Sequence, residues 1–395
     1  MRDIRIFLFS NQPVVRYKRS YYSRMKNFID LLSEVAKRGQ IYRLIVPCKR
    51  LKRPPNDDLV PIDMPLGVLE VLYYKGHWQA LLSNFVNAVY VSLLVQKERS
   101  RGRKVVLAGP GPNSFLFWLS FLVSRTVGFV FFIRGDTEKT VGHIYKGKLI
   151  FLLAKTLVEL FQRRIVFLLG QKRAHVFLFG EELRSLYEGH ESFVHVITPL
   201  IEKSFVRLDR REQIPEGRPL KVLYVGRLSE EKNIQALIEA FILKGRSKEA
   251  LSLDIIGFGG LEKSIRNRIR RNDGSSRIKF LGYIPHGDRL IAEFDKHDLL
   301  CLPSKTEGVP RVVIEAIARG MPVLATPVGS LPRLFTDEIR FLNGLDIKDI
   351  AEGLEWCSKN RQEISAMGER GKKAIFPFLI SENAKKINEI LNSSF

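Results

Sequence analysis

Two carboxylates and two cations stand where they could bind a ligand that carries both hydroxyls and phosphate. Glu307 and Glu315 lie in the run EGVPRVVIE, with seven residues between them. Arg227 and Lys232 lie in the run VLYVGRLSEEKN, at the end of an apolar segment. Carboxylates accept hydrogen bonds from hydroxyls, whereas guanidinium and ammonium groups pair with phosphate oxygens.

The two acids flank the start of a predicted helix. Pro310 suits a first helical turn, because that position needs no partner for its backbone N–H. Apolar residues then follow at helical spacing, and Gly320 ends the helix. Glu307 is therefore expected in the loop that opens the helix, and Glu315 about two turns further along. The N–H groups at such a helix start attract anions.

The two cations follow a predicted strand that ends at Gly226. Arg227 could fork onto phosphate oxygens, and Lys232 would add a point charge. Taken alone, the motif is also compatible with two solvated cations at the exit of a strand, just as the two acids alone are compatible with a capped surface helix.

The pattern around the acids resembles the retaining glycosyltransferases of family 4, the glycogen synthase and sucrose synthase type, also called glycosyl transferases group 1. It rests on these residues besides the two acids: Gly308, Pro310, Ala316, Gly320, Pro322, Val323 and Gly329. The resemblance implies an α/β protein of GT-B fold, with two Rossmann-like parallel-sheet domains facing a central cleft. It assigns the catalytic positions to Glu307 at the donor sugar and to Arg227 and Lys232 at the diphosphate. It assigns Glu315 to the ribose.

Further donor contacts follow from the same resemblance. The run IIGFGG holds a Gly-x-Gly turn that would let the backbone approach the nucleotide, and FLGYIPHGD would lie against the base. The expected donor-binding residues are Glu315, Gly308, Val309, Pro310, Arg311, Gly226, Gly257, Gly259, Tyr283 and Ile284. A plain tight turn at the glycines and a core position for Tyr283 are the alternatives.

The N-terminal part departs from the family. Relatives often have a glycine-rich loop after the first strand, but SNQPVVRYKRSYYSR, residues 10–24, contains no glycine. This segment could grip an anionic lipid-linked acceptor or form a solvated basic loop. Many relatives place a His where this chain reads IRGD, so Arg134 or Asp136 is the possible N-domain contact to the reacting sugar.

Charge is unevenly distributed along the chain. The net charge is +22, and residues 1–200 hold 31 Lys and Arg against 15 Asp and Glu. Nucleic acid, an anionic membrane leaflet or a phosphorylated acceptor could explain this excess. Residues 114–133 are apolar but broken by Arg125 and Gly128, which favours a buried or interfacial helix at about 115–124 over a membrane span. Residues 149–169 carry four charges, which also argues against a span.

Alternating strand and helix patterns predict two parallel sheets. The expected strands are 4–9, 41–46, 105–109, 128–133, 175–180, 221–226, 251–257, 278–284 and 299–304. The expected helices are 22–38, 149–169, 231–243, 260–271, 286–297 and 381–391. The expected domains are an N-terminal acceptor-binding domain 1–198, a linker 199–218, a C-terminal nucleotide-sugar-binding domain 219–375, and a helix 376–395 that packs back on the N-terminal domain.

The predicted function is transfer of a sugar, with retention, from a nucleotide-diphosphate sugar to a saccharide or lipid-linked saccharide in cell-surface polysaccharide or lipopolysaccharide synthesis. A UDP-sugar is favoured, then a GDP-sugar. No metal or cofactor is expected, because the chain lacks an Asp-x-Asp pair, a P-loop and other such motifs. The three cysteines and the missing signal-peptide pattern favour the cytoplasm, with peripheral contact to the cytosolic face of an anionic membrane.

Two alternatives stay open. A sugar-nucleotide epimerase or hydrolase could share this fold, and it would turn over its nucleotide sugar without an acceptor. A basic nucleic-acid-binding protein could explain the charge, and its affinity would fall steeply with salt. The chain lacks the usual nucleic-acid-binding motifs, so no nucleic acid partner is expected.

Overall fold

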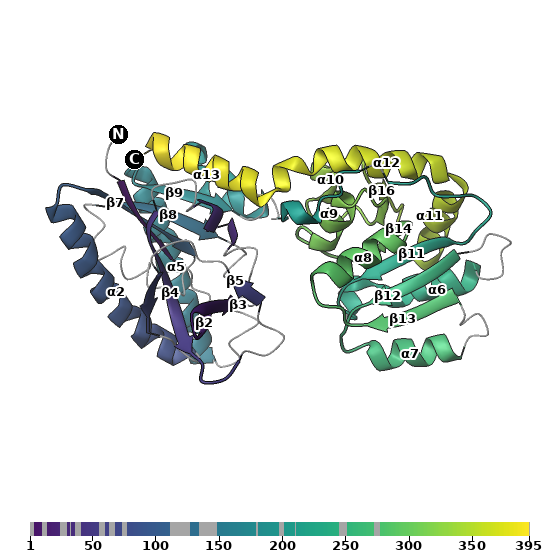
Figure 1. Cartoon of the computed structure of the whole chain (residues 1–395), viewed down its shortest axis with the longest axis horizontal. Helices are drawn as coiled ribbons and strands as arrows, with labels where there is room; N and C mark the ends of the chain where they lie inside the picture. Colours follow the sequence, from purple (N-terminus) through teal and green to yellow (C-terminus); the bar gives the residue numbers. More distant parts are fainter. Residues whose placement is uncertain are drawn as a thin grey trace. The chain divides into compact units, whose positions relative to one another are not determined.

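The chain forms two compact units, shown in Figure 1. Unit 1 comprises Met1–Leu200 and Ile380–Phe395, and unit 2 comprises Ile201–Leu379. The computed structural model describes these residues: 4–9, 14–23, 30–31, 33–35, 41–54, 60–62, 68–72, 77–110, 127–133, 148–178, 181–196, 201–209, 211–244, 251–271 and 277–394.

Unit 1 is built on one large sheet. Its strands are β1 (Ile4–Phe9), β2 (Val14–Tyr17), β3 (Ser20–Ser23), β4 (Ile41–Arg50), β5 (Val60–Ile62), β6 (Val68–Val71), β7 (Lys104–Pro110), β8 (Gly128–Ile133), β9 (Ala174–Leu178) and β10 (Val194–Val196). They lie in the order β10-β9-β8-β7-β1-β4-β2-β3-β5, with β6 also paired to β4. The pairs β2–β3 and β3–β5 are antiparallel, and the others are parallel.

Helices cover both faces of this sheet. Side chains alternate along β8, so that Phe129 and Phe131 pack with α2 (His77–Ser100) and α5 (Lys148–Gly170). Val130 and Phe132 face the opposite way, into a core shared with α13 (Ile380–Ser394). Burial on both faces explains why the central strands are almost wholly apolar.

The predicted strands of unit 1 are all present, but residues 10–24 differ from the prediction of a loop followed by a helix from residue 22. Residues 14–23 form the β2–β3 hairpin, with Lys18 at φ 53° in its turn. The aromatic pair Tyr21 and Tyr22 suits a strand, and β3 finds partners in β2 and β5. Of the predicted helix 22–38, residues 30–31 and 33–35 are helical.

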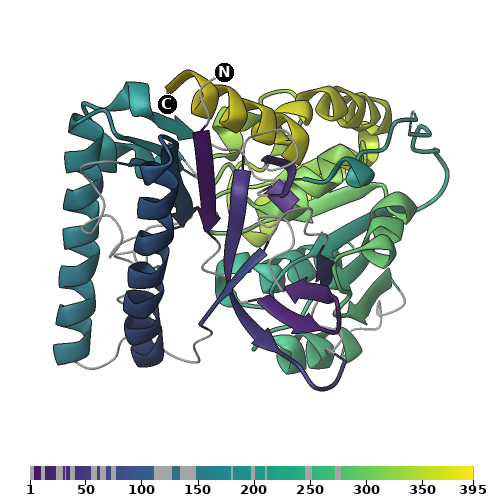
Figure 2. The same cartoon turned by 60° about the vertical axis from the view of Figure 1, so that its left-hand side comes forward.

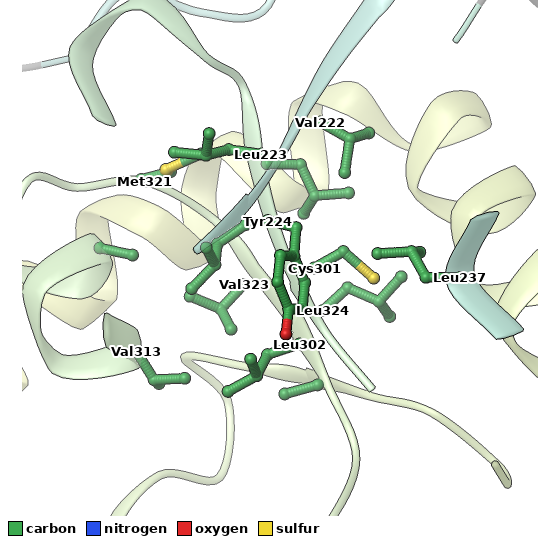
Figure 3. Packing of buried hydrophobic residues seen from close by; sticks show 14 of the residues in the cluster. Val222, Leu223, Tyr224, Leu237, Cys301, Leu302, Val313, Met321, Val323 and Leu324 are labelled. Carbon is green, nitrogen blue, oxygen red and sulfur yellow. The ribbon is translucent and has the colours of Figure 1, made fainter. Parts of the chain in front are cut away.

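Unit 2 contains a fully parallel sheet. Its strands are β11 (Leu220–Val225), β12 (Leu251–Ile256), β13 (Ile278–Gly282), β14 (Leu299–Leu302), β15 (Val323–Ala325) and β16 (Arg340–Phe341). They lie in the order β13-β12-β11-β14-β15-β16. Figure 3 shows part of its core, in which Tyr224 of β11 lies near Leu302 of β14 and Val323 and Leu324 of β15.

Helices connect the strands of this second sheet, and two more follow its last strand. The connecting helices are α6 (Ile234–Lys244), α7 (Glu262–Arg270), α8 (Asp288–Lys296), α9 (Arg311–Ala318) and α10 (Leu331–Leu334), and the two that follow β16 are α11 (Ile347–Lys359) and α12 (Arg361–Ala374). The helix predicted from residue 231 begins instead at Ile234, because a 3-10 turn, Glu230–Lys232, and Asn233 at φ 53° come first. The sequence analysis had no prediction for α2, α11 or α12.

Most of the proposed linker, residues 199–218, lies within unit 2, which begins at Ile201. Ile201, Phe205 and Ile214 are buried in the core of unit 2. The N–H of Ile201 also donates to the carbonyl of Phe378 at 2.9 Å. The prediction of a linker rested on the many charged residues of this segment and gave no weight to these apolar side chains.

The sequence also predicts a buried or interfacial helix in the N-terminal part and no membrane span. The predicted helix at about 115–124 lies outside the described residues. Within the described part of the chain, no helix combines the length and apolar character needed to cross a membrane.

A pair of histidines in unit 1 makes its stability sensitive to pH. The Nδ1 of His175 lies 3.1 Å from the Nε2 of His195 on the neighbouring strand. Burial, then the charge of His175 and that of Lys386, lower the pKa of His195 from 6.5 to about 4. Burial also lowers the pKa of His175.

We predict that unit 1 loses stability as the pH falls from about 6.5 towards 4, because the unfolded histidines bind protons that the folded ones exclude. The stabilisation is complete above the unfolded pKa. Between pH 7 and 5 the loss attributable to His195 should be about 1 kcal/mol, allowing for partial solvent exposure. Urea unfolding of the wild type and His195→Gln across this range measures it. Parallel pH dependences for the two proteins would contradict the assignment.

Candidate functional site

Most of the predicted site residues of unit 2 lie on loops at one edge of its sheet, and Arg311 and Glu315 lie on the helix α9 (Arg311–Ala318). Since the strands are parallel, their carboxyl ends share an edge, where ligands bind in such folds. These loops follow β11, β12, β13, β14 and β15 and comprise residues 226–233, 257–261, 283–287, 303–310 and 326–330.

An ion pair joins the loops after the adjacent strands β11 and β14. Lys232 Nζ lies 2.6 Å from Glu307 Oε1, and the two side chains are 13% and 11% exposed. Ser304 Oγ donates to the same Oε1 at 2.8 Å. Within the described part of the chain, Glu307 Oε2 accepts no hydrogen bond, and the ammonium uses one of its three donors. This nearly buried pair therefore has both acceptor and donor capacity left for a ligand.

Backbone contacts hold the Glu307 loop in place from two sides. The N–H of Lys305 donates to the carbonyl of Glu231 at 2.8 Å, which fastens the loop to the turn that carries Lys232. On the other side, Thr326 Oγ1 donates to the carbonyl of Ser304 at 2.5 Å. The ion pair thus depends on the order of the strands rather than on sequence proximity.

Gly329 lets another segment pack directly behind this loop. Its φ is +61°, and a Cβ there would lie 2.1 Å from the carbonyl oxygen of Gly308 and 2.4 Å from that of Glu307. The neighbouring N–H of Ser330 donates to Gly308 at 3.0 Å. A side chain at residue 329 would therefore push the carboxylate loop out of position.

Glu315 has a separate set of partners. It lies on α9, which begins after Pro310, and its Oε1 is 3.2 Å from both Arg311 Nη2 and His286 Nε2. The His286 ring stacks on the buried Phe205 with the centroids 4.8 Å apart. Among the described residues nothing donates to Glu315 Oε2. The first amides of α9 also have no intrahelical acceptor, as at any helix start.

The Arg227 side chain is 67% exposed, and its Nη2 lies 3.1 Å from Glu231. Beneath it, the Tyr224 hydroxyl donates to the Arg227 carbonyl at 2.8 Å. Burial, followed by the charges of Glu307 and Glu231, raises the pKa of Tyr224. The phenol therefore remains protonated and fixes the backbone, while the guanidinium can reach a ligand.

The predicted glycines interlock two neighbouring loops. A Cβ on Gly257 would lie 1.9 Å from the Gly226 carbonyl oxygen, and one on Gly259 would lie 2.4 Å from that of Leu228. The Leu228 N–H donates to the Phe258 carbonyl at 2.9 Å. These positions require glycine because the two backbones touch.

Two exposed aromatic rings stand beside these glycines. Phe258 and Tyr283 are 56% and 61% exposed and meet edge to face with centroids 5.1 Å apart. The alternative interpretation of Tyr283 as a core residue is therefore wrong. Ile284 and Val309, by contrast, are partly buried against the unit 2 core.

The structure thus brings Lys232 and Glu307 into contact and supports Glu315 separately. Arg134 and Asp136 lie outside the described residues. Sequence reasoning missed Ser304 and His286 beside the acids, Tyr224 and Glu231 beside Arg227, and the second aromatic ring, Phe258. Ser304 ends the predicted strand 299–304, and the other four stand within the runs quoted above, which was the available signal. The described residues contain no group of His, Cys, Asp and Glu able to hold a metal ion.

Comparison with known proteins agrees with this geometry. The family described as "Glycosyl transferases group 1" matches residues 206–374. The chain is similar to the amylovoran biosynthesis glycosyltransferase AmsK of Erwinia amylovora, with 30% identity over 31% of each chain. It is also similar to glycogen synthase of Mycobacterium tuberculosis, with 31% identity over 30% of this chain and 28% of that protein. The chain therefore matches less than a third of the length of these two relatives.

Solved structures resemble the whole chain at low identity. The lipopolysaccharide outer core galactosyltransferase WaaB matches with a TM-score of 0.64 at 15% identity, over 99% of this chain and 100% of that one. HepE of Anabaena, in complex with UDP and glucose, matches with a TM-score of 0.63 at 15% identity over 100% of both chains. These likenesses confirm the predicted fold class, α/β with two parallel sheets. Within unit 2, residues 206–374 match the sequence pattern of the family described as glycosyl transferases group 1.

Proposed function

We propose that the chain is a retaining glycosyltransferase whose unit 2 binds a nucleotide-diphosphate sugar. The observation that carries the proposal is the Lys232–Glu307 pair at 2.6 Å, in which Glu307 Oε2 and two of the ammonium donors have no partner among the described residues. A ligand that carries hydroxyls beside phosphate would give hydrogen-bond partners to both the Glu307 carboxylate and the Lys232 ammonium.

Each part of the donor has a candidate partner at this edge of the sheet. Lys232 and Arg227 would neutralise the diphosphate, and the first amides of α9 would add donors. Glu307 Oε2 would accept from a sugar hydroxyl, and Glu315 Oε2 from the ribose. The exposed edge-to-face pair of Phe258 and Tyr283 would lie against the base.

The proposed reaction exchanges one bond at the anomeric carbon for another on the same face of the sugar. The bond from that carbon to the diphosphate oxygen breaks as the bond to the acceptor oxygen forms. The acceptor hydroxyl proton passes to the departing phosphate oxygen. No protein base is needed, and the contribution of Lys232 and Arg227 is to stabilise charge on the leaving group.

Relatives support the choice of substrates. HepE is described in complex with UDP-glucose, which favours a UDP-sugar, with a GDP-sugar next. AmsK is named for amylovoran biosynthesis, and WcaL of Escherichia coli for putative colanic acid biosynthesis. We therefore propose a saccharide or lipid-linked saccharide acceptor, bound by unit 1, in surface polysaccharide synthesis. The excess of cations in residues 1–200 supports a cytoplasmic protein that contacts an anionic membrane peripherally.

Carboxamide variants should separate the roles of the two acids. Glu315→Gln should weaken UDP itself by at least ~10-fold, because a hydrogen bond to a charged group contributes about 1.5–3 kcal/mol. Glu307→Gln should leave UDP affinity within ~2-fold and weaken the UDP-sugar. Calorimetric titration of UDP and a panel of UDP-sugars measures both. Equal effects of the two variants on UDP would contradict the assignment.

Removal of either cation should slow catalysis more than it weakens binding. Lys232→Ala and Arg227→Ala should each lower kcat by at least ~10²-fold if they stabilise leaving-group charge. Lys348→Ala is the control, because Lys348 is 85% exposed on α11. Release of nucleoside diphosphate, measured at saturating donor, gives kcat. Changes below twofold in both cation variants would remove them from the mechanism.

Acceptor dependence distinguishes transfer from isomerisation or hydrolysis. We expect nucleotide sugar turnover to require a saccharide acceptor and the new linkage to keep the anomeric configuration of the donor. Proton NMR of the reaction follows both. Isomerisation at full rate without an acceptor would favour an epimerase and overturn the proposal.

A further inference from the structure

Unit 1 exposes an unusual concentration of large apolar side chains on two helices. Nine of the nineteen exposed large apolar residues in the described part of the chain lie on α2 and α5. We call them the apolar face: Phe85, Val86, Val89, Tyr90, Leu93, Leu152, Leu160, Val166 and Phe167. The buried sides of both helices share one core, so both present their outer sides on the same side of the sheet. Figure 2 shows the two helices side by side.

On its outer side α2 carries apolar side chains, where a helix that meets water carries polar ones. Its outward residues recur every three or four positions from Phe85 to Leu93, and each is at least 41% exposed. Its inward side includes the buried polar residues Asn84, Asn87 and Glu98. An apolar patch of this kind indicates a surface that meets another apolar phase.

A cationic edge adjoins this face. β2 pairs with β4 so that Arg16 lies opposite Arg50, and both guanidiniums bond the one carboxylate of Glu70, at 2.6 Å and 2.9 Å. The group therefore keeps a positive charge. Further cations stand in the hairpin turn and along the end of β4 and the chain after it. The cationic edge comprises Arg16, Lys18, Arg19, Lys49, Arg50, Lys52 and Arg53.

A cavity joins the cationic edge to the apolar face. It measures about 580 Å³, and its lining includes Arg50 and Glu70 from the edge together with Leu72, Val86 and Tyr90. Asn87 fastens α2 to the end of β6, where its Oδ1 accepts from the N–H of Leu72 at 3.2 Å. The charged and apolar parts are therefore one continuous surface.

We propose that this surface is where unit 1 lies on an anionic bilayer, with lipid phosphates at the cationic edge and acyl chains against the apolar face. Aromatic and aliphatic residues beside cations are the composition of interfacial helices. A second copy of the chain fits less well, because a two-fold contact would bring the cationic edges near each other. Nucleic acid would leave the apolar face uncovered. The inference rests on the peripheral membrane contact of the proposed function and names the surface responsible.

Flotation of the full chain with vesicles tests the apolar part. Leu93→Ser should lower partitioning into phosphatidylcholine–phosphatidylglycerol vesicles about 10-fold, the effect expected for one buried leucine. Leu243→Ser is the matched control, because Leu243 on α6 is 58% exposed and Leu93 is 59% exposed. The control should bind like the wild type. Equal loss in both variants, or no loss in Leu93→Ser, would overturn the proposal.

Charge reversal tests the cationic part. Lys52→Glu with Arg53→Glu should reduce binding to the anionic vesicles by at least ~10-fold, since each cation near such a surface contributes about 1 kcal/mol. Binding of the wild type should also weaken with added salt. Lys348→Glu in unit 2 is the control and should have no effect. Unchanged binding of the double variant would overturn the proposal.

Two further measurements keep the interpretations apart. A wild type that does not bind anionic vesicles at low salt would end the membrane contact in the proposed function as well as this inference. Vesicle binding that Leu93→Ser leaves intact ends this inference alone.

Light scattering would show whether Leu93→Ser dissociates a dimer. Such a result would make a second copy of the chain the partner of the apolar face and would overturn the proposal. UDP titration should be unchanged in every surface variant, since none lies in the nucleotide site.

Discussion

The site depends on one nearly buried carboxylate that a single ammonium group neutralises. Removing a charge from water costs several kcal/mol unless a partner of opposite charge accompanies it. Glu307 and Lys232 stand 75 residues apart in the sequence, so the pair forms only when β11 and β14 lie side by side. The Lys305 N–H and the Thr326 hydroxyl hold the carboxylate loop in position before any ligand binds. One carboxylate oxygen and two ammonium donors of the pair have no partner in the described part of the chain, so they are left for a ligand. Such preorganisation reduces the cost of binding and of charge development.

Backbone packing around this pair leaves little room for variation. The loops after β11 and β12 touch at Gly226 and Gly257, and the segment behind the carboxylate loop touches it at Gly329. A side chain at either of the last two positions would meet a carbonyl oxygen closer than any van der Waals contact allows. The same glycines that complete the family pattern therefore set the distance between the strand-end loops. This fixed spacing between the loops holds the charged side chains in position.

The sequence predicted regular, locally encoded elements well. Parallel strands buried on both faces are almost wholly apolar, and Pro310 and Gly320 predict the bounds of α9 to within two residues. The β2–β3 hairpin was not predicted because RYKRSYY shows no apolar alternation. The helix α2 was not predicted because its exposed side carries apolar side chains as well as its buried side. The contact between His286 and Glu315 depends on which loops the sheet brings together, which local periodicity does not encode. The family resemblance predicts the roles of the two acids, and the structure shows their partners.

The most direct test of this account is a crystal structure of the chain with a non-hydrolysable nucleoside-diphosphate sugar. The account predicts a diphosphate oxygen within about 3.2 Å of Lys232 Nζ and a sugar hydroxyl at a similar distance from Glu307 Oε2. The ribose hydroxyls should meet Glu315. A nucleotide bound elsewhere, or a Lys232–Glu307 pair that contacts no part of the bound donor, would contradict the account.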